Sequence, residues 1–151
     1  MSAESRLAEL GLTLPEPPKP IGSYVTFVRA GSLGFTSGHG PAGPEGLVTG
    51  KVGAELDLEA GAAAARLTGL NLLATLRREL GSLDAVARVV KVVGMVNCPP
   101  SFTQHPAVIN GCSDLLVEVF GDAGRHARSA VGMGSLPMDM AVEIELVVEL
   151  R

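Results

Sequence analysis

Hydrophobic residues recur with a helical period over two long stretches of the chain. Between Asp57 and Gly81 they return every three to four positions, and these two residues suit the N-terminal and C-terminal caps of a helix. The second stretch runs from Pro106 to Gly121, with an apolar stripe of Val108, Cys112, Leu115 and Val119. Proline suits a first helical turn because the amide it lacks would be unpaired there. The pattern predicts two amphipathic helices.

Strand patterns surround these helices. Residues 24–29 and 33–36 have the spacing of a hairpin. In 141–150 every second residue from Val142 to Leu150 is apolar, and three of the four residues between them are glutamates. Residues 128–133 form a further predicted strand, and 85–96 is rich in valine at positions that would point to both faces of a sheet. The order strand, strand, loop, helix, strand, helix, strand, strand predicts an α+β fold, with two helices on one face of a mixed sheet. Too little chain is left to cover the other face, so other copies of the protein are expected to cover it.

The N-terminal part has a different character. Residues 1–10 can form a helical turn or two, and regular structure is then prevented by Pro15, Pro17, Pro18 and Pro20. We therefore expect a proline-rich leader over 1–20 and a single domain over 21–151. Residues 37–50 contain five glycines and two prolines and are expected to form a loop, with a short strand near Leu47 and Val48.

Composition excludes several classes of function. The formal net charge is −4 and no run of Lys or Arg is present, so nucleic acid is not an expected partner. No apolar stretch approaches the length that spans a bilayer, and the N-terminus lacks the apolar region of a secretory signal. We expect a cytoplasmic protein that does not enter a membrane. Cys98 and Cys112 lack a companion at metal-binding spacing and are expected to be packed thiols.

Neither a dinucleotide-binding motif nor a zinc-binding motif is supported by the surrounding sequence. A G-x-G-x-x-G pattern is formed by Gly38, Gly40 and Gly43, but prolines follow where a dinucleotide site needs a helix. The three histidines, at 39, 105 and 126, do not share a helical face, so a zinc site has no support. We therefore expect neither a cofactor nor a metal.

Two separated segments carry a resemblance to a known family. From Ala127 the chain reads ARSAVGMGSLPMDMAVEIE, and nearer the N-terminus it contains PIGSYV, from Pro20, followed by FTSGHGP, from Phe35. The first resembles the RidA (YjgF) signature, in which an Arg-Ser/Thr-x-Val strand precedes Leu-Pro and a Glu-Ile-Glu strand. The second is similar to the family's Gly-Pro-Tyr and Thr-Ser-Gly-Gln segments. The likeness covers about residues 20–150.

The resemblance implies a fold and an activity. The fold is chorismate-mutase-like and assembles as a homotrimer, whose central barrel would hide the uncovered sheet face. The implied activity is the hydrolysis of reactive enamines and imines to 2-keto acids and ammonia, without a cofactor, in a pocket at each subunit interface. The expected partner is a small carboxylate-bearing imine, enamine or keto acid.

The resemblance also implies roles for particular residues. Arg128 would hold the substrate carboxylate with two charge-assisted hydrogen bonds, which its planar donor fork suits. Glu143 would orient or deprotonate the attacking water. Tyr24 would close the pocket, and Ser37 with the Gly38 amide would meet the polar end of the substrate.

Other positions depart from the family pattern. Ala130 stands where family deaminases often carry Cys, although the backbone carbonyl there is implied to hold water. His39 replaces a Gln, and Ser113 stands where many members have Asn. His126 is a possible specificity contact beside Arg128, and a surface histidine is its alternative.

Each assignment has a plainer alternative. Arg128 could form a surface ion pair, and Glu143 could lie on a solvated strand face. Tyr24 could be a packing residue and Ser37 a turn residue. For the whole protein, the alternatives are a non-catalytic trimer that binds a carboxylate metabolite, and a ribonuclease or translation inhibitor, against which the acidic charge argues.

Overall fold

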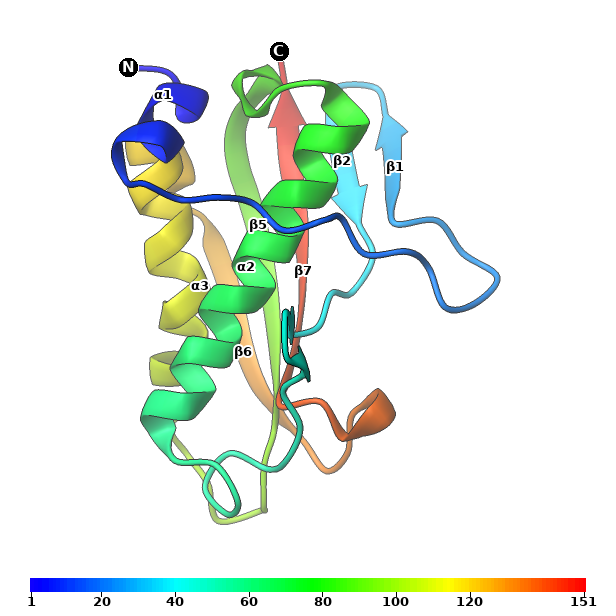
Figure 1. Cartoon of the computed structure of the whole chain (residues 1–151), viewed down its shortest axis with the longest axis vertical. Coiled ribbons are helices and arrows are strands. Elements are labelled where there is room, and N and C mark those ends of the chain that lie inside the picture. The colour runs from blue at the N-terminus through cyan, green and yellow to red at the C-terminus, as the bar shows by residue number, and fades with distance from the viewer.

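The computed structural model describes all 151 residues and contains a five-stranded sheet (Figure 1). Its strands are β1 (Phe27–Ala30), β2 (Leu33–Thr36), β5 (Val86–Asn97), β6 (Ala127–Met133) and β7 (Val142–Leu150), in the order β1-β2-β7-β5-β6. Only β5 and β6 are parallel, and the other neighbours are antiparallel. The predicted α+β architecture with a mixed sheet is confirmed.

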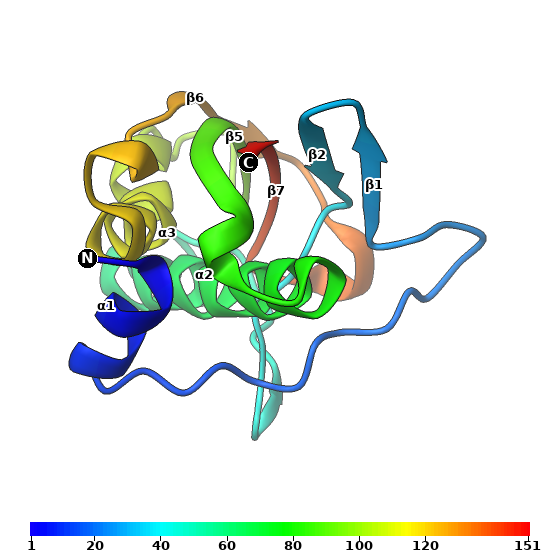
Figure 2. The same ribbon diagram turned by 90° about the horizontal axis from the view of Figure 1, so that it is seen from above.

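Two long helices, α2 (Leu58–Leu80) and α3 (His105–Phe120), cover one face of the sheet (Figure 2). The Asp57 carboxylate accepts a hydrogen bond from the Ala60 N–H at 2.8 Å and caps the start of α2. Gly81 ends the same helix at φ 81°, a left-handed conformation that glycine adopts without strain. Both predicted caps of α2 are therefore confirmed.

Small residues allow α2 and α3 to pack closely. A side chain at Gly111 would collide with the backbone carbonyl of Ala62, and one at Gly69 would press on Cys112 and Leu115. Cys98 and Cys112 are both buried free thiols, as expected. Burial raises the pKa of the Cys112 thiol to about 12, so this side chain remains protonated and packs as a small apolar group.

The hydrophobic core lies between the helices and the sheet. The alternation in β7 directs one set of side chains into it: Val142, Ile144, Leu146, Val148 and Leu150. Within one chain only one face of β5 is buried, so burial of its other face would need another copy. Val89, Val92 and Val96 are fully buried, whereas Val90 is 37% exposed, because helices cover only one face.

The other face of the sheet is uncovered in a single chain (Figure 2). Apolar side chains lie on it, including Val28 (52% exposed), Phe35 (39%) and Val131 (40%). Val28 pairs with Phe35, and Phe35 pairs with Val147, so these side chains share one surface. This is an apolar face of the kind that marks an interaction surface.

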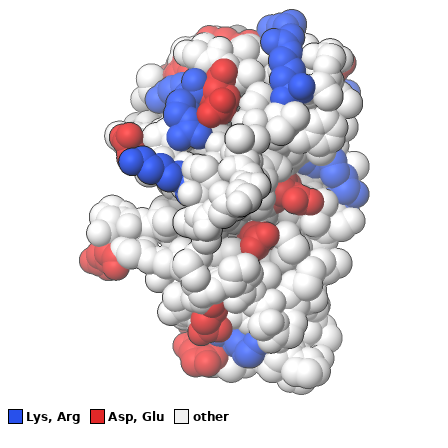
Figure 3. All heavy atoms as spheres, turned by 90° about the vertical axis from the view of Figure 1, so that its right-hand side faces the viewer, with Lys and Arg blue, Asp and Glu red and all other residues white.

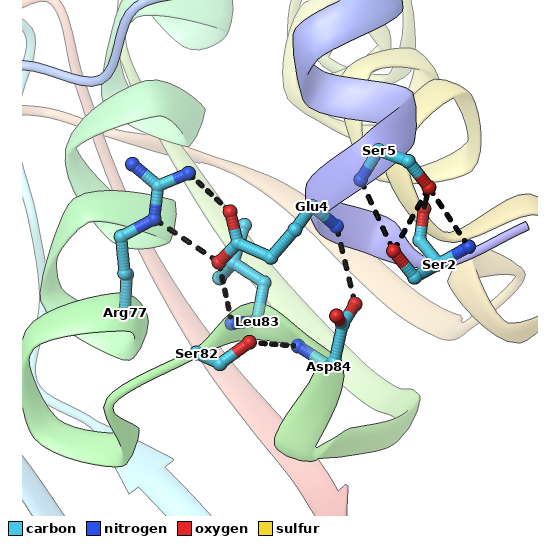
Figure 4. Close-up of polar contacts among 7 residues, drawn as sticks. All are labelled: Ser2, Glu4, Ser5, Arg77, Ser82, Leu83 and Asp84. Atoms are coloured by element: carbon cyan, nitrogen blue, oxygen red, sulfur yellow. Dashed lines mark hydrogen bonds and ion pairs between the residues drawn. The ribbon is translucent and has the colours of Figure 1, made fainter.

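The helical turns expected within residues 1–10 are confirmed, and they pack on the domain as a third helix. Helix α1 (Ala3–Glu9) packs on α3, and Leu7 is only 3% exposed, so the hydrophobic core begins before residue 21. Glu4 anchors this helix: its carboxylate accepts hydrogen bonds from the Arg77 guanidinium and from the Leu83 N–H (Figure 4). The Glu4 N–H in turn donates to Asp84 in the short helix η1 (Leu83–Ala85). Hydrogen bonding to Arg77 is the main reason that the pKa of Glu4 is lowered.

The remaining segments connect these elements at both ends of the sheet and across α2. Residues 12–20 have no regular structure and cross the outer side of α2 (Figures 1 and 2). The loop after β2 contains a small hairpin of β3 (Ala42–Gly43) and β4 (Gly46–Leu47), and the short helices η2 (Gly121–Gly124) and η3 (Pro137–Asp139) precede β6 and β7. No helix is both long enough and apolar enough to cross a bilayer.

The first strand is shorter than expected. It begins at Phe27 rather than at residue 24. The Thr26 carbonyl accepts the Ser37 N–H, and its hydroxyl accepts a hydrogen bond from Arg78 on α2 at 2.8 Å. Pairing with the chain after β2 thus continues at Thr26, whereas residues 21–25 are not part of the sheet, and Tyr24 lines a cavity.

Candidate functional site

A cavity of about 480 Å³ lies at the start of β7. The leader, the loop after β2, the β3–β4 hairpin, η3 and β7 all contribute to its walls. Five of the predicted site residues line it: Tyr24, Ser37, Gly38, His39 and Glu143. Residues from segments more than a hundred positions apart therefore meet at one place.

Glu143 is the acidic group of this cavity. Its side chain leaves β7 on the uncovered face, opposite to the buried Val142 and Ile144. The carboxylate lies against Gly38 so closely that a side chain there would collide with it. Partial burial, and then the neighbouring charge of Glu145, raise the pKa of Glu143. A carboxyl with a raised pKa is a stronger base than an ordinary glutamate, which suits it to accept a proton and return it.

Two unpaired polar groups belong to residues that line the same cavity as this carboxylate. The Ser37 hydroxyl is buried and has no hydrogen-bond partner in the chain. The Gly38 N–H also has no backbone partner, whereas the N–H groups of Ser37 and His39 donate to the carbonyls of Thr26 and Ile144. Buried polar groups are rarely left without partners, so an unpaired hydroxyl in a cavity wall points to a ligand or water.

His39 holds the loop instead of presenting a free nitrogen. Its Nδ1 lies 2.8 Å from the Ser37 carbonyl and its Nε2 lies 2.8 Å from the Thr75 hydroxyl on α2. Because a carbonyl only accepts, Nδ1 carries the proton, and Nε2 accepts from Thr75. Burial lowers the pKa of His39, which is only 3% exposed, so the ring is neutral. Its two nitrogens are both occupied within the chain.

The apolar wall of the cavity was missed by sequence reasoning. Leu47, Met138 and Met140 line it, near the exposed ring of Tyr24, whose hydroxyl accepts the Ile21 N–H at 3.3 Å. Met138 is at φ 55°, in the left-handed region that a side chain adopts at some cost. The Leu-Pro pair just before Met138 belongs to the family-like segment, but no local period marks Met138 itself.

The loop that carries Met138 is anchored by its neighbour. Asp139 is also in the left-handed region, at φ 56°. Its carboxylate accepts a hydrogen bond from Asn97 at 2.9 Å, and its carbonyl accepts the Gly50 N–H at 2.9 Å. These contacts fix the unusual backbone at the mouth of the cavity.

Arg128 belongs to a second cluster, on β6 and α3. Its Nη1 donates to the Asn110 side-chain oxygen at 2.7 Å and to the Ser113 hydroxyl at 3.1 Å. Its Nε and Nη2 have no partner in the chain, and together they form one side of the guanidinium fork. Sequence reasoning identified Ser113 but missed Asn110. The i, i+3 spacing of the two on one helical face could have indicated it.

The two clusters lie on opposite faces of the sheet. Arg128 pairs with Val92, which pairs with the buried Leu146, so Arg128 points to the helix side. Glu143 pairs with Met95 on the other face. From strand spacing and rise, the Arg128 and Glu143 Cα atoms are roughly 14 Å apart.

Ala130 accompanies the arginine cluster. It pairs with Gly94 and lies two residues after Arg128, so its side chain points to the same face and packs against the core. One chain therefore brings Tyr24, Ser37, Gly38, His39 and Glu143 together and places Arg128, Ser113 and Ala130 elsewhere.

The chain contains no group of three or more His, Cys, Asp or Glu residues placed to hold a metal ion. The three histidines lie apart, and each has a partner within the chain. His39 contacts Thr75, His126 contacts Ser113, and His105 lies 3.4 Å from the Cys98 sulfur.

A mixed sheet with helices on one face, and a cavity holding an unpaired carboxyl and hydroxyl, define a small α+β protein with a partly polar cavity. The family model described as "YjgF/chorismate_mutase-like, putative endoribonuclease" matches residues 4–150. The chain belongs to this family, and the predicted chorismate-mutase-like fold is confirmed.

Three relatives illustrate the range of similarity. Protein TCP17 of Trypanosoma cruzi is 44% identical over 149 residues, which cover 97% of this chain and 93% of the relative. The crystal structure of Atu1372 from Agrobacterium tumefaciens, whose function is unknown, is 43% identical, covers 98% of this chain and 91% of that chain, and has a TM-score of 0.89. The crystal structure of E. coli TdcF with bound serine is 27% identical. The match covers 90% of this chain and 94% of that chain, and it has a TM-score of 0.61.

Proposed function

We propose that this protein hydrolyses reactive imines and enamines derived from small 2-amino acids, releasing 2-keto acids and ammonia. The observation that carries the proposal is the Glu143 carboxyl. It is partly buried, has a raised pKa, lies against Gly38, and shares its cavity with Ser37, whose hydroxyl is unpaired. Such a group can activate a water molecule and return the proton to the leaving nitrogen.

The site is proposed to be completed by a second copy of the chain. Arg128 and Glu143 are on opposite faces in one chain, β6 is an edge strand, and the uncovered sheet face is apolar. A closed homotrimer would bury that face and bring the Arg128 cluster of one copy against the Glu143 cavity of the next. The family resemblance supports this arrangement.

Arg128 is proposed to hold the substrate carboxylate. Its free Nε and Nη2 can donate two parallel hydrogen bonds to the two carboxylate oxygens. This contact fixes the position of the adjacent imine carbon relative to the water. The bound serine in TdcF, which is an amino acid with a carboxylate, supports a ligand of this class.

The proton then moves through Glu143. As water attacks the imine carbon, the Glu143 carboxylate accepts its proton and passes it to the imine nitrogen, which gives a carbinolamine. The carboxylate then takes the proton of the carbinolamine hydroxyl and donates it to the amine nitrogen as the C–N bond breaks and the C=O bond forms. The products are the 2-keto acid and ammonia, and an enamine first becomes the imine by gaining a proton on its β carbon and losing one from its nitrogen. Every step is acid–base chemistry, so the proposal includes no cofactor.

The main alternative is a trimer that binds a carboxylate metabolite without turnover. It keeps Arg128 but gives Glu143 no role in a reaction. The family description also names an endoribonuclease activity. The net charge of −4 argues against it, and on the face drawn in Figure 3 Lys and Arg form separate patches among acidic side chains.

The experiment measures 2-keto acid release from imines freshly generated by an amino-acid oxidase. Wild type is compared with Arg128→Ala and Glu143→Gln, with Ser101→Ala in an exposed turn as the control. We expect acceleration by wild type and the control, and loss of it in both site variants. Binding of 2-oxobutanoate without any acceleration over buffer, for small and branched imines, would instead establish the non-catalytic alternative. Salt-dependent cleavage of RNA would support the ribonuclease reading.

A further inference from the structure

The arginine cluster contains a chain of hydrogen bonds that reaches beyond Arg128. The Ser113 hydroxyl, which accepts from Arg128 Nη1 at 3.1 Å, also lies 2.9 Å from Nε2 of His126. The other ring nitrogen of His126, Nδ1, lies 2.6 Å from the Gly124 carbonyl. Four groups from β6, α3 and the turn between them are therefore linked in series.

The direction of each hydrogen bond follows from the chemistry of its partners. The Gly124 carbonyl can only accept, so the proton of the His126 ring is on Nδ1. Burial and the charge of Arg128 lower the pKa of His126, with the Gly124 contact opposing them, and the ring is neutral near pH 7. Its Nε2 lone pair then accepts the Ser113 hydroxyl proton. The Ser113 oxygen is left with its lone pairs toward Arg128, which can only donate.

This arrangement determines which donors of Arg128 are free. Nη1 is occupied twice, by Ser113 and by the Asn110 side-chain oxygen at 2.7 Å. The planar guanidinium is therefore fixed in rotation, with Nε and Nη2 turned away from α3. A serine whose hydroxyl rotated freely could point its proton at Arg128 and repel it. The acceptor on His126 prevents this.

We propose that Ser113 and His126 are positioning residues, which orient the free side of the Arg128 guanidinium to receive a carboxylate. This inference rests on the proposed function, because it assumes that Arg128 is the carboxylate ligand. His126 does not contact the substrate itself, because both of its ring nitrogens are already occupied within the chain. It acts through Ser113.

The first test is made on the unmodified protein. Nitrogen-15 NMR of the histidine rings at neutral pH is expected to show His126 as the neutral tautomer with the proton on Nδ1. A ring protonated on Nε2, or on both nitrogens, would overturn the proposal, because Nε2 could not then accept from Ser113. This measurement does not depend on whether any variant folds.

The second test separates binding from turnover. Ser113→Ala and His126→Phe are expected to weaken binding of 2-oxobutanoate and to raise KM for small imines about tenfold, while kcat changes by less than about twofold. Ser113→Thr, which keeps a hydroxyl, should restore near wild-type binding, and Ser101→Ala should bind as wild type. A merely structural role would not raise KM while leaving kcat nearly unchanged.

Binding of 2-oxobutanoate by Arg128→Ala distinguishes a failure of the positioning role from a failure of the proposed function. If Arg128→Ala loses 2-oxobutanoate binding but Ser113→Ala and His126→Phe bind as wild type, the positioning role is wrong and the proposed function stands. If Arg128→Ala also binds as wild type, Arg128 is not the carboxylate ligand. The proposed function and the positioning role then both fail.

Discussion

Arg128 and Glu143 leave the sheet of one chain on opposite faces, from strands that are separated by β5. A single chain therefore cannot bring both side chains to one small substrate without unfolding the sheet. If they act together, they must come from different copies, and this requirement can be tested directly.

Mixing two inactive variants should restore activity. Unfolded Arg128→Ala and Glu143→Gln chains, refolded together in equal amounts, would form closed rings in which about a quarter of the interfaces carry both intact residues. We expect about a quarter of the wild-type rate of keto acid release, whereas each variant refolded alone should be inactive. Absence of any recovery in mixed oligomers of confirmed composition would show that the two residues do not share a site.

The raised pKa of Glu143 predicts how activity depends on pH. The carboxylate form is the base, so kcat should fall as the pH is lowered through a value above 4.5, the ordinary pKa of a glutamate. A pH–rate profile of kcat measures this acid limb. If the limb instead lies at or below the ordinary range, Glu143 is not the group that accepts the proton from water.

The raised pKa of Glu143 also predicts that the folded state is less stable, relative to the unfolded state, when this carboxyl is ionised. Because the pKa of Glu143 is higher in the folded state, its favourable contribution is present at low pH and is lost as the pH rises through the folded value. At neutral pH, Glu143→Gln should therefore be at least as stable as wild type while its activity is lost. Thermal unfolding at pH 7 provides the measurement, and a lower Tm for the variant would contradict the prediction.

Gly38→Ala should disturb the site and leave the fold intact. A methyl group there would meet the Glu143 carboxylate, a flexible side-chain end that can move away without unfolding the sheet. We expect a loss of activity of at least about tenfold with little change in Tm, because the carboxylate would leave its position against Gly38. Gly134→Ala, where nothing lies within contact distance, is the matched control.

Gly111→Ala should instead lower the stability of the fold. The added methyl group would collide with the Ala62 backbone carbonyl across the contact between α2 and α3, and neither helix backbone can move easily. We expect a loss of about 1–3 kcal/mol in the free energy of unfolding, as for other overpacked cores. Urea denaturation measures it. A variant as stable as wild type would mean that α2 and α3 leave room for a methyl group between Gly111 and the Ala62 carbonyl.

The sequence by itself determined the elements whose signals are local. The caps of α2 at Asp57 and Gly81, and the alternation of β7 around Ile144, are properties of neighbouring residues and of a fixed period. The family-like segments added Arg128 and Glu143 as candidates. None of these signals required knowledge of which residues meet in space.

Only the tertiary structure decided the contacts between distant segments. Glu4 meets Arg77 and makes α1 part of the core, and Glu143 meets Gly38, although no period or motif along the chain relates the members of either pair. The separation of Arg128 from Glu143 likewise depends on the order and register of the strands. Such relationships arise when the chain buries its apolar surface, and that process joins residues without regard to their distance in sequence.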